Sequence, residues 1–162
     1  MTMTTEQVQA FLYREARLLD DRQWDEWLAC YSENAEFWMP SWDDDGELTR
    51  DPQSEISLIY YPNRSGLEDR IFRIQTERSS ASTPLPRTLH QTSNVEILSQ
   101  DGQQLKVRFN WHTLSFRNHT TDSYFGTSEY TLDVSGAQPV IQRKYVVLKN
   151  DYISHVIDVY HI

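Results

Sequence analysis

The last third of the chain, from Leu105 to Ile162, constrains the fold most strongly, because apolar and aromatic residues recur there at every second position. A period of two is typical of strands whose two faces see different surroundings. Short polar breaks separate four alternating segments, and these breaks are too short for the crossover helix that a parallel neighbour requires. The segments are built on Leu105–Thr113, Tyr124–Val134, Val140–Leu148 and Ile153–His161. The pattern therefore predicts an antiparallel meander of four strands.

Three amphipathic helices are predicted upstream of this sheet. Thr4 followed by Gln7 resembles a capping box, and the apolar residues after it recur at helical spacing. Asp21 is expected to cap the second helix, which should end at Ser32–Asn34. The helices are predicted over about Thr5–Asp20, from Asp21 to Tyr31, and from Ser65 or Gly66 to Ile74. Each has an apolar stripe that another element must cover.

Further alternating segments complete the predicted sheet at Ala35–Pro40, Ile56–Tyr61 and Thr88–Ser99. Helices gathered in the N-terminal half and strands gathered after them indicate an α+β domain. We expect a strongly curved mixed or antiparallel sheet of about six strands, curled into a cone with the three helices on its concave face. The absence of a long Gly/Ser-rich or Pro-rich linker predicts a single domain over residues 1–162.

The charge of the chain excludes several kinds of partner. Fifteen Lys and Arg residues against 24 Asp and Glu residues give a net charge of −9. An acidic surface repels phosphate groups and anionic lipids, so we expect neither nucleic acid nor a membrane as a partner. The apolar stretches are far shorter than the ~20 residues that cross a bilayer, and Met1–Asp20 shows no signal-peptide pattern. We therefore expect a cytoplasmic protein.

The residues that usually bind metals are too few or too far apart. Cys30 is the single cysteine, so an intrachain disulfide is excluded, as is a Rieske centre, which needs two cysteines and two histidines. A mononuclear iron site needs two histidines and a carboxylate at one point. His155 and His161 share a face of the last predicted strand, but they would lie about 20 Å apart. We expect no metal or cofactor in this chain.

A charged loop is predicted over Ser41–Asp51. Its three adjacent carboxylates, Asp43–Asp45, suggest calcium, but the distal acidic ligand of an EF-hand loop is missing. A solvated loop fits the composition better. Trp42 is unusual in such a loop and could anchor a partner.

One catalytic interpretation remains open from the residues alone. A curved cone can enclose an apolar pocket in which a carboxylate or a histidine takes a proton from a small polycyclic substrate. Asp20, Asp21 and His90 are candidates for this role, with Trp24 and Tyr130 as pocket walls. The competing interpretation of Asp20 and Asp21 is a helix end followed by a cap. A cone without chemistry of its own could instead serve as a scaffold, with exposed aromatic residues contacting other subunits.

Ten ordered segments carry a resemblance to a known family. Five are similar to small, or beta, subunits of aromatic-ring-hydroxylating dioxygenases: Phe11–Asp20, Trp24–Tyr31, Phe37–Pro40, Leu67–Ile74 and Ser93–Ile97. The others resemble the benzoate and toluate 1,2-dioxygenase subgroup: Trp42–Asp45, Ile59–Arg64, Phe109–Thr113, Thr121–Gly126 and Lys144–Ile153. The resemblance covers about residues 5–162, nearly the whole chain.

The resemblance implies a cone of the nuclear-transport-factor-2 (NTF2-like) or cystatin-like type. It also implies an α3β3 hexamer whose large, or alpha, subunit holds the Rieske [2Fe-2S] cluster and the mononuclear Fe(II). In such an enzyme, electrons from NADH support cis-dihydroxylation of an aromatic ring. The small subunit is then a mainly structural trimer, and the family supplies no catalytic residue to transfer to this chain.

We therefore interpret the chain as a non-catalytic structural subunit of a dioxygenase that cis-dihydroxylates benzoate-type acids. The alternatives are a stand-alone NTF2-like isomerase or dehydratase and a module that binds a small ligand. Exposed aromatic and charged residues mark the expected subunit interfaces. These residues are Trp42, Asp44, Tyr60, Tyr61, Arg64, Arg108 and His112. Part of the outer sheet face is expected to be the surface where identical cones meet.

Overall fold

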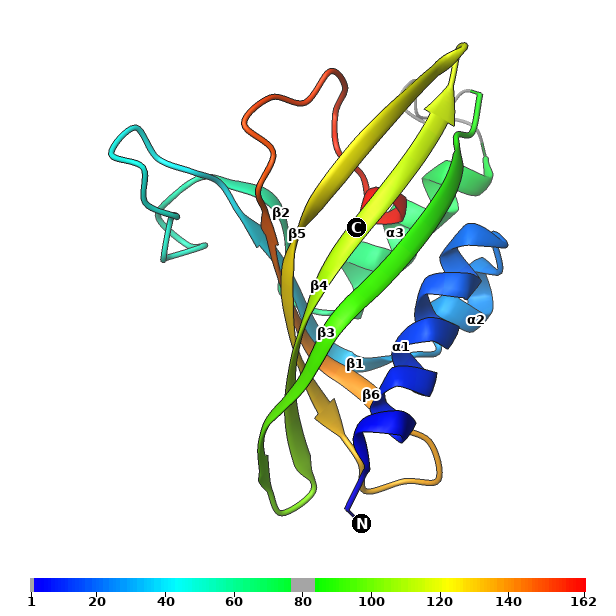
Figure 1. Cartoon of the computed structure of the whole chain (residues 1–162), viewed down its shortest axis with the longest axis vertical. Coiled ribbons are helices and arrows are strands. Elements are labelled where there is room, and N and C mark those ends of the chain that lie inside the picture. The colour runs from blue at the N-terminus through cyan, green and yellow to red at the C-terminus, as the bar shows by residue number, and fades with distance from the viewer. Residues whose placement is uncertain (1, 77–83) are drawn as a thin grey trace.

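The computed structural model describes residues 2–76 and 84–162 as three α-helices and a mixed six-stranded sheet (Figure 1). The helices are α1 (Thr5–Asp20), α2 (Trp24–Leu28) and α3 (Arg64–Gln75). The strands are β1 (Tyr31–Pro40), β2 (Ser57–Tyr61), β3 (Arg87–Asp101), β4 (Gln104–Arg117), β5 (Thr120–Asp133) and β6 (Val140–Leu148). A short 3-10 helix, η2, spans Val159–His161. This arrangement confirms the predicted α+β class, the six strands and the three helices. The Ser- and Pro-containing sequence after Glu77, whose composition indicates a loop, falls largely outside the described residues.

The strands lie in the order β2-β1-β6-β5-β4-β3. All neighbours are antiparallel except β1 and β6, which run parallel. β3 to β6 therefore form a meander, as the alternation predicts, and β1 joins the far side of β6. Figure 1 shows the sheet curling around the helices, with α1 across the face of β3 and α3 nearer β1.

The fourth strand predicted for Ile153–His161 was wrong. Residues 149–158 form no helix or strand, and η2 follows them. The physical reason is that β5 and β1 already occupy both edges of β6, so no edge is free beside it for another strand. The buried residues of this segment fill the core instead, and Asp158 both caps η2 and forms an ion pair with Arg70 of α3. His155 and His161 consequently share no strand face.

Three predicted helix boundaries also needed correction. α2 ends at Leu28, and Tyr31 through Asn34 belong to β1. Asp21 is the C-cap of α1 rather than the cap of α2. α3 begins at Arg64, because the Asn63 side chain accepts a hydrogen bond from the Ser65 backbone N–H. The predicted capping box at the start of α1 is confirmed.

The core lies between the helices and the concave face of the sheet. Alternate residues of β4 show this division. Leu105, Val107, Phe109 and Trp111 are buried toward the helices. Their neighbours point to the convex face, where no helix of the described chain lies. None of the described helices is long and apolar enough to cross a membrane.

Candidate functional site

Glu15 of α1 is the centre of a buried polar cluster inside the cone. Its carboxylate accepts hydrogen bonds from Trp27 Nε1 at 2.7 Å and from the hydroxyls of Tyr130 and Tyr31 at 2.5 and 3.3 Å. Burial, and then the negative charge of Glu15, raise the pKa of both tyrosines well above its usual value. Both phenols therefore stay neutral and act as hydrogen-bond donors to one buried carboxylate.

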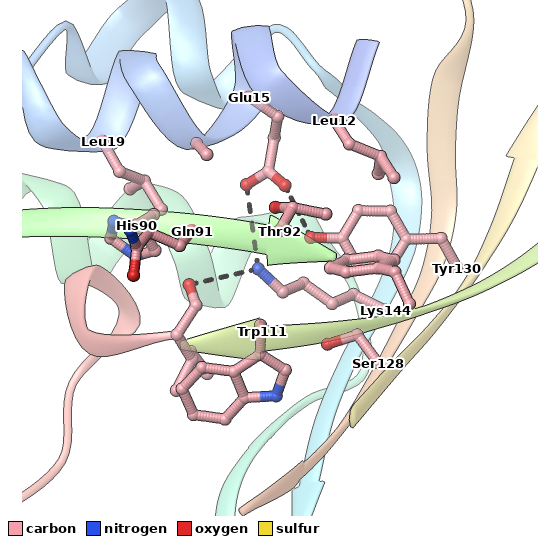
Figure 2. A pocket seen from close by; sticks show the side chains of 13 residues that line it. Leu12, Glu15, Leu19, His90, Gln91, Thr92, Trp111, Ser128, Tyr130 and Lys144 are labelled. Atoms are coloured by element: carbon pink, nitrogen blue, oxygen red, sulfur yellow. Dashed lines mark hydrogen bonds and ion pairs between the residues drawn. The ribbon is translucent and has the colours of Figure 1, made fainter. Parts of the chain in front are cut away.

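Lys144 of β6 supplies the positive charge of this cluster. Its side chain is 2% exposed, and its Nζ lies 3.7 Å from Glu15 Oε2 and 3.4 Å from the Ile162 carbonyl oxygen (Figure 2). Burial lowers the pKa of Lys144, and the carboxylate of Glu15 opposes this shift. The ammonium also lies 5.0 and 5.3 Å from the ring centroids of Phe37 and Tyr130. Through three hydrogen bonds and one ion pair, Glu15 of α1 thus joins α2, β1, β5 and β6.

A second polar pair links the end of α1 to β3. Asp20 Oδ1 lies 2.5 Å from His90 Nδ1 and accepts a hydrogen bond from Thr88 Oγ1 at 2.9 Å. Asp20 Oδ2 accepts from the His90 backbone N–H at 3.0 Å. The structure therefore brings together Asp20 and His90, two of the three residues that the sequence suggested for acid–base chemistry. Asp21, the third, is exposed and ends the helix.

A small cavity lies between these two polar groups (Figure 2). Its walls include Leu12, Leu19, Trp111 and Tyr130, with Glu15, His90 and Lys144 as titratable members. The space open to the centre of a water-sized sphere is about 20 Å³, which holds about one water molecule. Trp24, predicted as a wall, is buried elsewhere in the core. The cavity in its present form excludes a ring-sized substrate.

The metal-ligating residue types do not converge. In the described part of the chain, no group of three or more His, Cys, Asp or Glu side chains is placed to hold a metal ion. Burial, followed by the charge of Glu15, raises the pKa of Cys30 to about 11, so the thiol is protonated and unreactive at neutral pH. Burial lowers the pKa of His161 to about 4.

Trp42 and Asp44 lie in the acidic loop between β1 and β2. The loop is exposed along most of its length, as predicted. Trp42 is 45% exposed, but its indole N–H donates to the Leu148 carbonyl oxygen at 2.6 Å. This bond holds the indole beside the end of β6 while one side of the ring stays open to solvent. Asp44 is exposed in the turn that follows.

Tyr60, Tyr61 and Arg64 lie on β2 and at the start of α3. The Tyr60 hydroxyl donates to Glu36 at 3.1 Å on the convex face. Tyr61 points to the other face, where a Cβ added to Gly66 of α3 would lie 2.4 Å from its ring. Arg64 donates to the Tyr31 carbonyl oxygen at 2.9 Å. Tyr61 and Arg64 therefore hold α3 against the sheet.

Arg108 and His112 lie on the convex face of β4, both partly buried. Arg108 is opposite Glu129 in the ladder, and His112 Nε2 lies 2.6 Å from Ser123 Oγ. The structure thus separates the predicted interface residues into a group at one end of the sheet, a group around α3 and a group on the convex face.

Sequence reasoning missed two parts of this arrangement. The first is the pairing of Glu15 with Lys144. Each of these residues occupies an inward position of an apolar pattern, and their opposite charges are the signal that could have predicted the pair. The second is a stack on the convex face, where the Arg143 guanidinium lies 5.7 and 5.2 Å from the Trp38 and Tyr145 rings and donates to Glu36. Its members come from two strands, β1 and β6, that are about 100 residues apart in the sequence, and no local pattern joins them.

Comparison with known proteins gives a consistent result. Residues 14–155 match the model of the ring hydroxylating beta subunit family. The benzoate 1,2-dioxygenase subunit beta of Acinetobacter baylyi is 63% identical over 99% of this chain and 95% of its own length. The toluate 1,2-dioxygenase subunit beta of Pseudomonas putida is 60% identical over 100% of both chains. Among solved structures, the beta subunit of benzoate 1,2-dioxygenase from Burkholderia mallei is 60% identical, with a TM-score of 0.85 over 100% of this chain and 99% of the other.

Proposed function

Because this chain belongs to the ring hydroxylating beta subunit family, we propose that it is the structural small subunit of a dioxygenase that cis-dihydroxylates a benzoate-type aromatic acid. The observation that carries this proposal is the identity of 60–63% over nearly the full length with the subunits of benzoate and toluate dioxygenases. The cone is the NTF2-like fold that the resemblance implies, and it matches the solved benzoate dioxygenase subunit along its whole length.

In this proposal the chemistry belongs to the large subunit. That subunit would hold the Rieske [2Fe-2S] cluster and the mononuclear Fe(II), and would receive electrons that come from NADH. The organisation of this chain supports the division. Its buried titratable residues bind one another, as Glu15 and Lys144 do, and no described group of side chains has the geometry of a metal site. The small subunit then contributes shape and rigidity to the complex.

A stand-alone isomerase or dehydratase is the second candidate, and the contact between Asp20 and His90 is the observation that favours it. A histidine held by a carboxylate can act as a general base. The adjoining cavity has room for about one water molecule, however, so a polycyclic substrate would require α1 or β3 to move. Turnover of such substrates by the isolated chain, lost in His90→Ala, would favour this candidate over the structural one.

We further propose two different interfaces within an α3β3 hexamer. The end of the sheet where β1 and β6 end exposes a set of large apolar residues, named here the sheet-end surface: Trp42, Ile56, Phe125, Tyr152 and Val156. The acidic loop contributes Trp42 and Ile56 to this surface and surrounds them with charge. Residues 41–56 contain six carboxylates and one arginine, so they carry a net charge of −5 out of the −9 of the whole chain. Two copies of this end would repel each other, so it suits a partner with a basic rim.

The convex face suits self-association better. Arg108, His112, Glu129 and Arg143 give it both signs of charge, around the aromatic rings of Trp38 and Tyr145. Aromatic residues and arginine are enriched at the centres of protein interfaces. We propose that Arg108 and His112 lie in the trimer contact, that Trp42 and Asp44 contact the large subunit, and that the complex is cytoplasmic.

The test is co-expression with the large subunit of a benzoate-type dioxygenase. We expect co-purification at the mass of six chains, and oxygenation of benzoate once a reductase and NADH are added. A chain that stays monomeric beside a folded large subunit, or a large subunit that is assembled and fully active alone, would overturn the proposal. A complex of another stoichiometry would overturn only the hexamer.

A further inference from the structure

His90 presents an unused hydrogen-bonding atom to the interior of the cone. Its side chain is 7% exposed and lines the cavity described above. Its Nε2 is fully buried, and no atom among residues 2–76 and 84–162 forms a hydrogen bond with it. Burying a polar atom without a hydrogen-bond partner is unfavourable, so such an atom in a folded protein calls for a partner.

The contact with Asp20 determines what kind of occupant fits. A carboxylate only accepts hydrogen bonds, so the ring nitrogen that faces it, Nδ1, carries the proton. Two further donors, Thr88 Oγ1 and the His90 backbone N–H, hold the carboxylate in this orientation. In the neutral ring, Nε2 then carries no proton and has a lone pair that accepts a hydrogen bond. The partner of Nε2 must therefore be a hydrogen-bond donor.

Lys144 lines the same cavity, and its ammonium group requires a hydrogen-bond acceptor. Its ammonium has three donors, and its two oxygen partners, on Glu15 and Ile162, lie at the long distances of 3.7 and 3.4 Å. A molecule that accepts from Lys144 and donates to His90 Nε2 would satisfy both groups. Water and small hydroxyl compounds have this double character.

Size and access agree with a very small ligand. The space of about 20 Å³ exceeds the 10–15 Å³ that one water requires, by a small margin. A surface groove between α1 and β3 shares Ala16, His90, Gln91 and Thr92 with the cavity, so the cavity adjoins this groove.

We propose that this cavity is a binding site for one small hydrogen-bond donor, occupied by water in solution, with the Asp20–His90 pair as its acceptor and Lys144 as its donor. The site is independent of subunit assembly and of catalysis in a partner. Among the described residues a rival donor is Thr113, which lies opposite His90 in the ladder and whose Oγ1 is also buried without a partner there. A rotated Thr113 hydroxyl would donate to Nε2 directly.

The test is a crystal structure of the full chain at a resolution that shows ordered water, together with nitrogen NMR of the histidine rings. We expect a water about 2.7–3.2 Å from His90 Nε2, with a second contact to Lys144. The NMR spectrum should show His90 protonated at Nδ1 and unprotonated at Nε2. A dry cavity, a proton on Nε2 of the neutral ring, or a Thr113 hydroxyl within hydrogen-bonding distance of Nε2 would each overturn the proposal.

Three variants sharpen the NMR measurement. Asp20→Asn removes the carboxylate that holds Nδ1–H, so the proton should shift at least partly to Nε2. Asp21→Asn, an exposed neighbour with the same chemical change, should leave the ring unchanged. Thr113→Val should also leave the Nε2 signal in place, because the proposed donor is water. A Thr113→Val spectrum in which Nε2 loses its hydrogen bond would show that the hydroxyl, and not water, is the donor.

Discussion

At the scale of single residues, the interior of this cone depends on one carboxylate. Glu15 accepts three hydrogen bonds and faces the buried ammonium of Lys144. Both charges were removed from water when the chain folded, and their attraction offsets that loss only while both are present. The pair is therefore expected to define how α1 sits on the sheet more than to add net stability.

Glu15→Gln should destabilise the chain by about 3–5 kcal/mol, the usual loss when one partner of a buried pair is removed. The amide keeps the size of the side chain but leaves Lys144 without its counter-ion. Urea unfolding at pH 7 measures the change. Glu26→Gln is the matched control, because its ion pair with Arg14 is long and solvent-exposed, and it should lose under about 1 kcal/mol. Equal losses in both variants would contradict the assigned role of Glu15.

At the scale of elements, the packing of β4, β5 and β6 depends on a glycine. Gly126 is opposite Trp111 and Leu148 in the two ladders. A Cβ at this position would lie 1.8 Å from the Val147 carbonyl oxygen and 3.2 Å from Trp111 Nε1, which donates to the Thr127 carbonyl oxygen. The central strand can approach its neighbours this closely only because residue 126 has no side chain.

Gly126→Ala should therefore destabilise the protein, although alanine in a strand interior is normally favourable over glycine by about 0.5–1 kcal/mol. Forcing the backbones apart should cost about 1–3 kcal/mol. Thermal unfolding of the variant measures the effect. Gly136→Ala, in the loop between β5 and β6, is the control, because its Cβ would have no neighbour closer than 3.8 Å. A more stable Gly126→Ala protein would show that the strands are less tightly packed than described.

At the scale of the whole molecule, charge and exposed apolar area are unevenly distributed. The net charge of −5 in residues 41–56 borders the sheet-end surface, while the convex face has both signs. A charged rim around apolar residues steers association with a partner of opposite sign and makes the rate depend on salt. The sheet-end surface and the convex face are thus suited to different neighbours.

Replacing Asp43, Asp44 and Asp45 together by asparagine should slow association with the large subunit about 10-fold or more at low salt. The effect should fade as salt rises, because the removed attraction is electrostatic. Surface plasmon resonance across a salt series measures it. The fold should persist, since asparagine can still accept the hydrogen bonds that Asp43 and Asp45 receive from the loop backbone.

The control for this variant carries the same change of charge elsewhere. Glu33, Glu96 and Asp101 are exposed away from the acidic loop, and their neutralisation should leave the rate nearly unchanged. If both triple variants slow association equally, only the net charge of the chain matters, and the sheet-end surface is not the docking site. Self-association of the small subunit should be retained in the variant of Asp43, Asp44 and Asp45.

Much of this fold could be predicted because it depends on local patterns. The capping box at Thr4, the helical spacing through Leu19 and the alternation from Leu105 to Leu148 each specify an element through neighbours in the chain. The acidic loop and the outward direction of Arg108 and His112 follow from composition and a period of two. The family resemblance added the expectation of a complex with a large subunit.

What the sequence by itself determined is therefore the elements, their inward faces and the family. Only the tertiary structure decided that β1 pairs with β6, that Ile153–His161 forms no strand, and that Glu15 meets Lys144 and Asp20 meets His90. These features join residues that are 70 to 129 positions apart, or depend on which sheet edge is already occupied. A periodic pattern shows which face of a strand is buried, but the partner across the core is chosen by the packing of the whole chain.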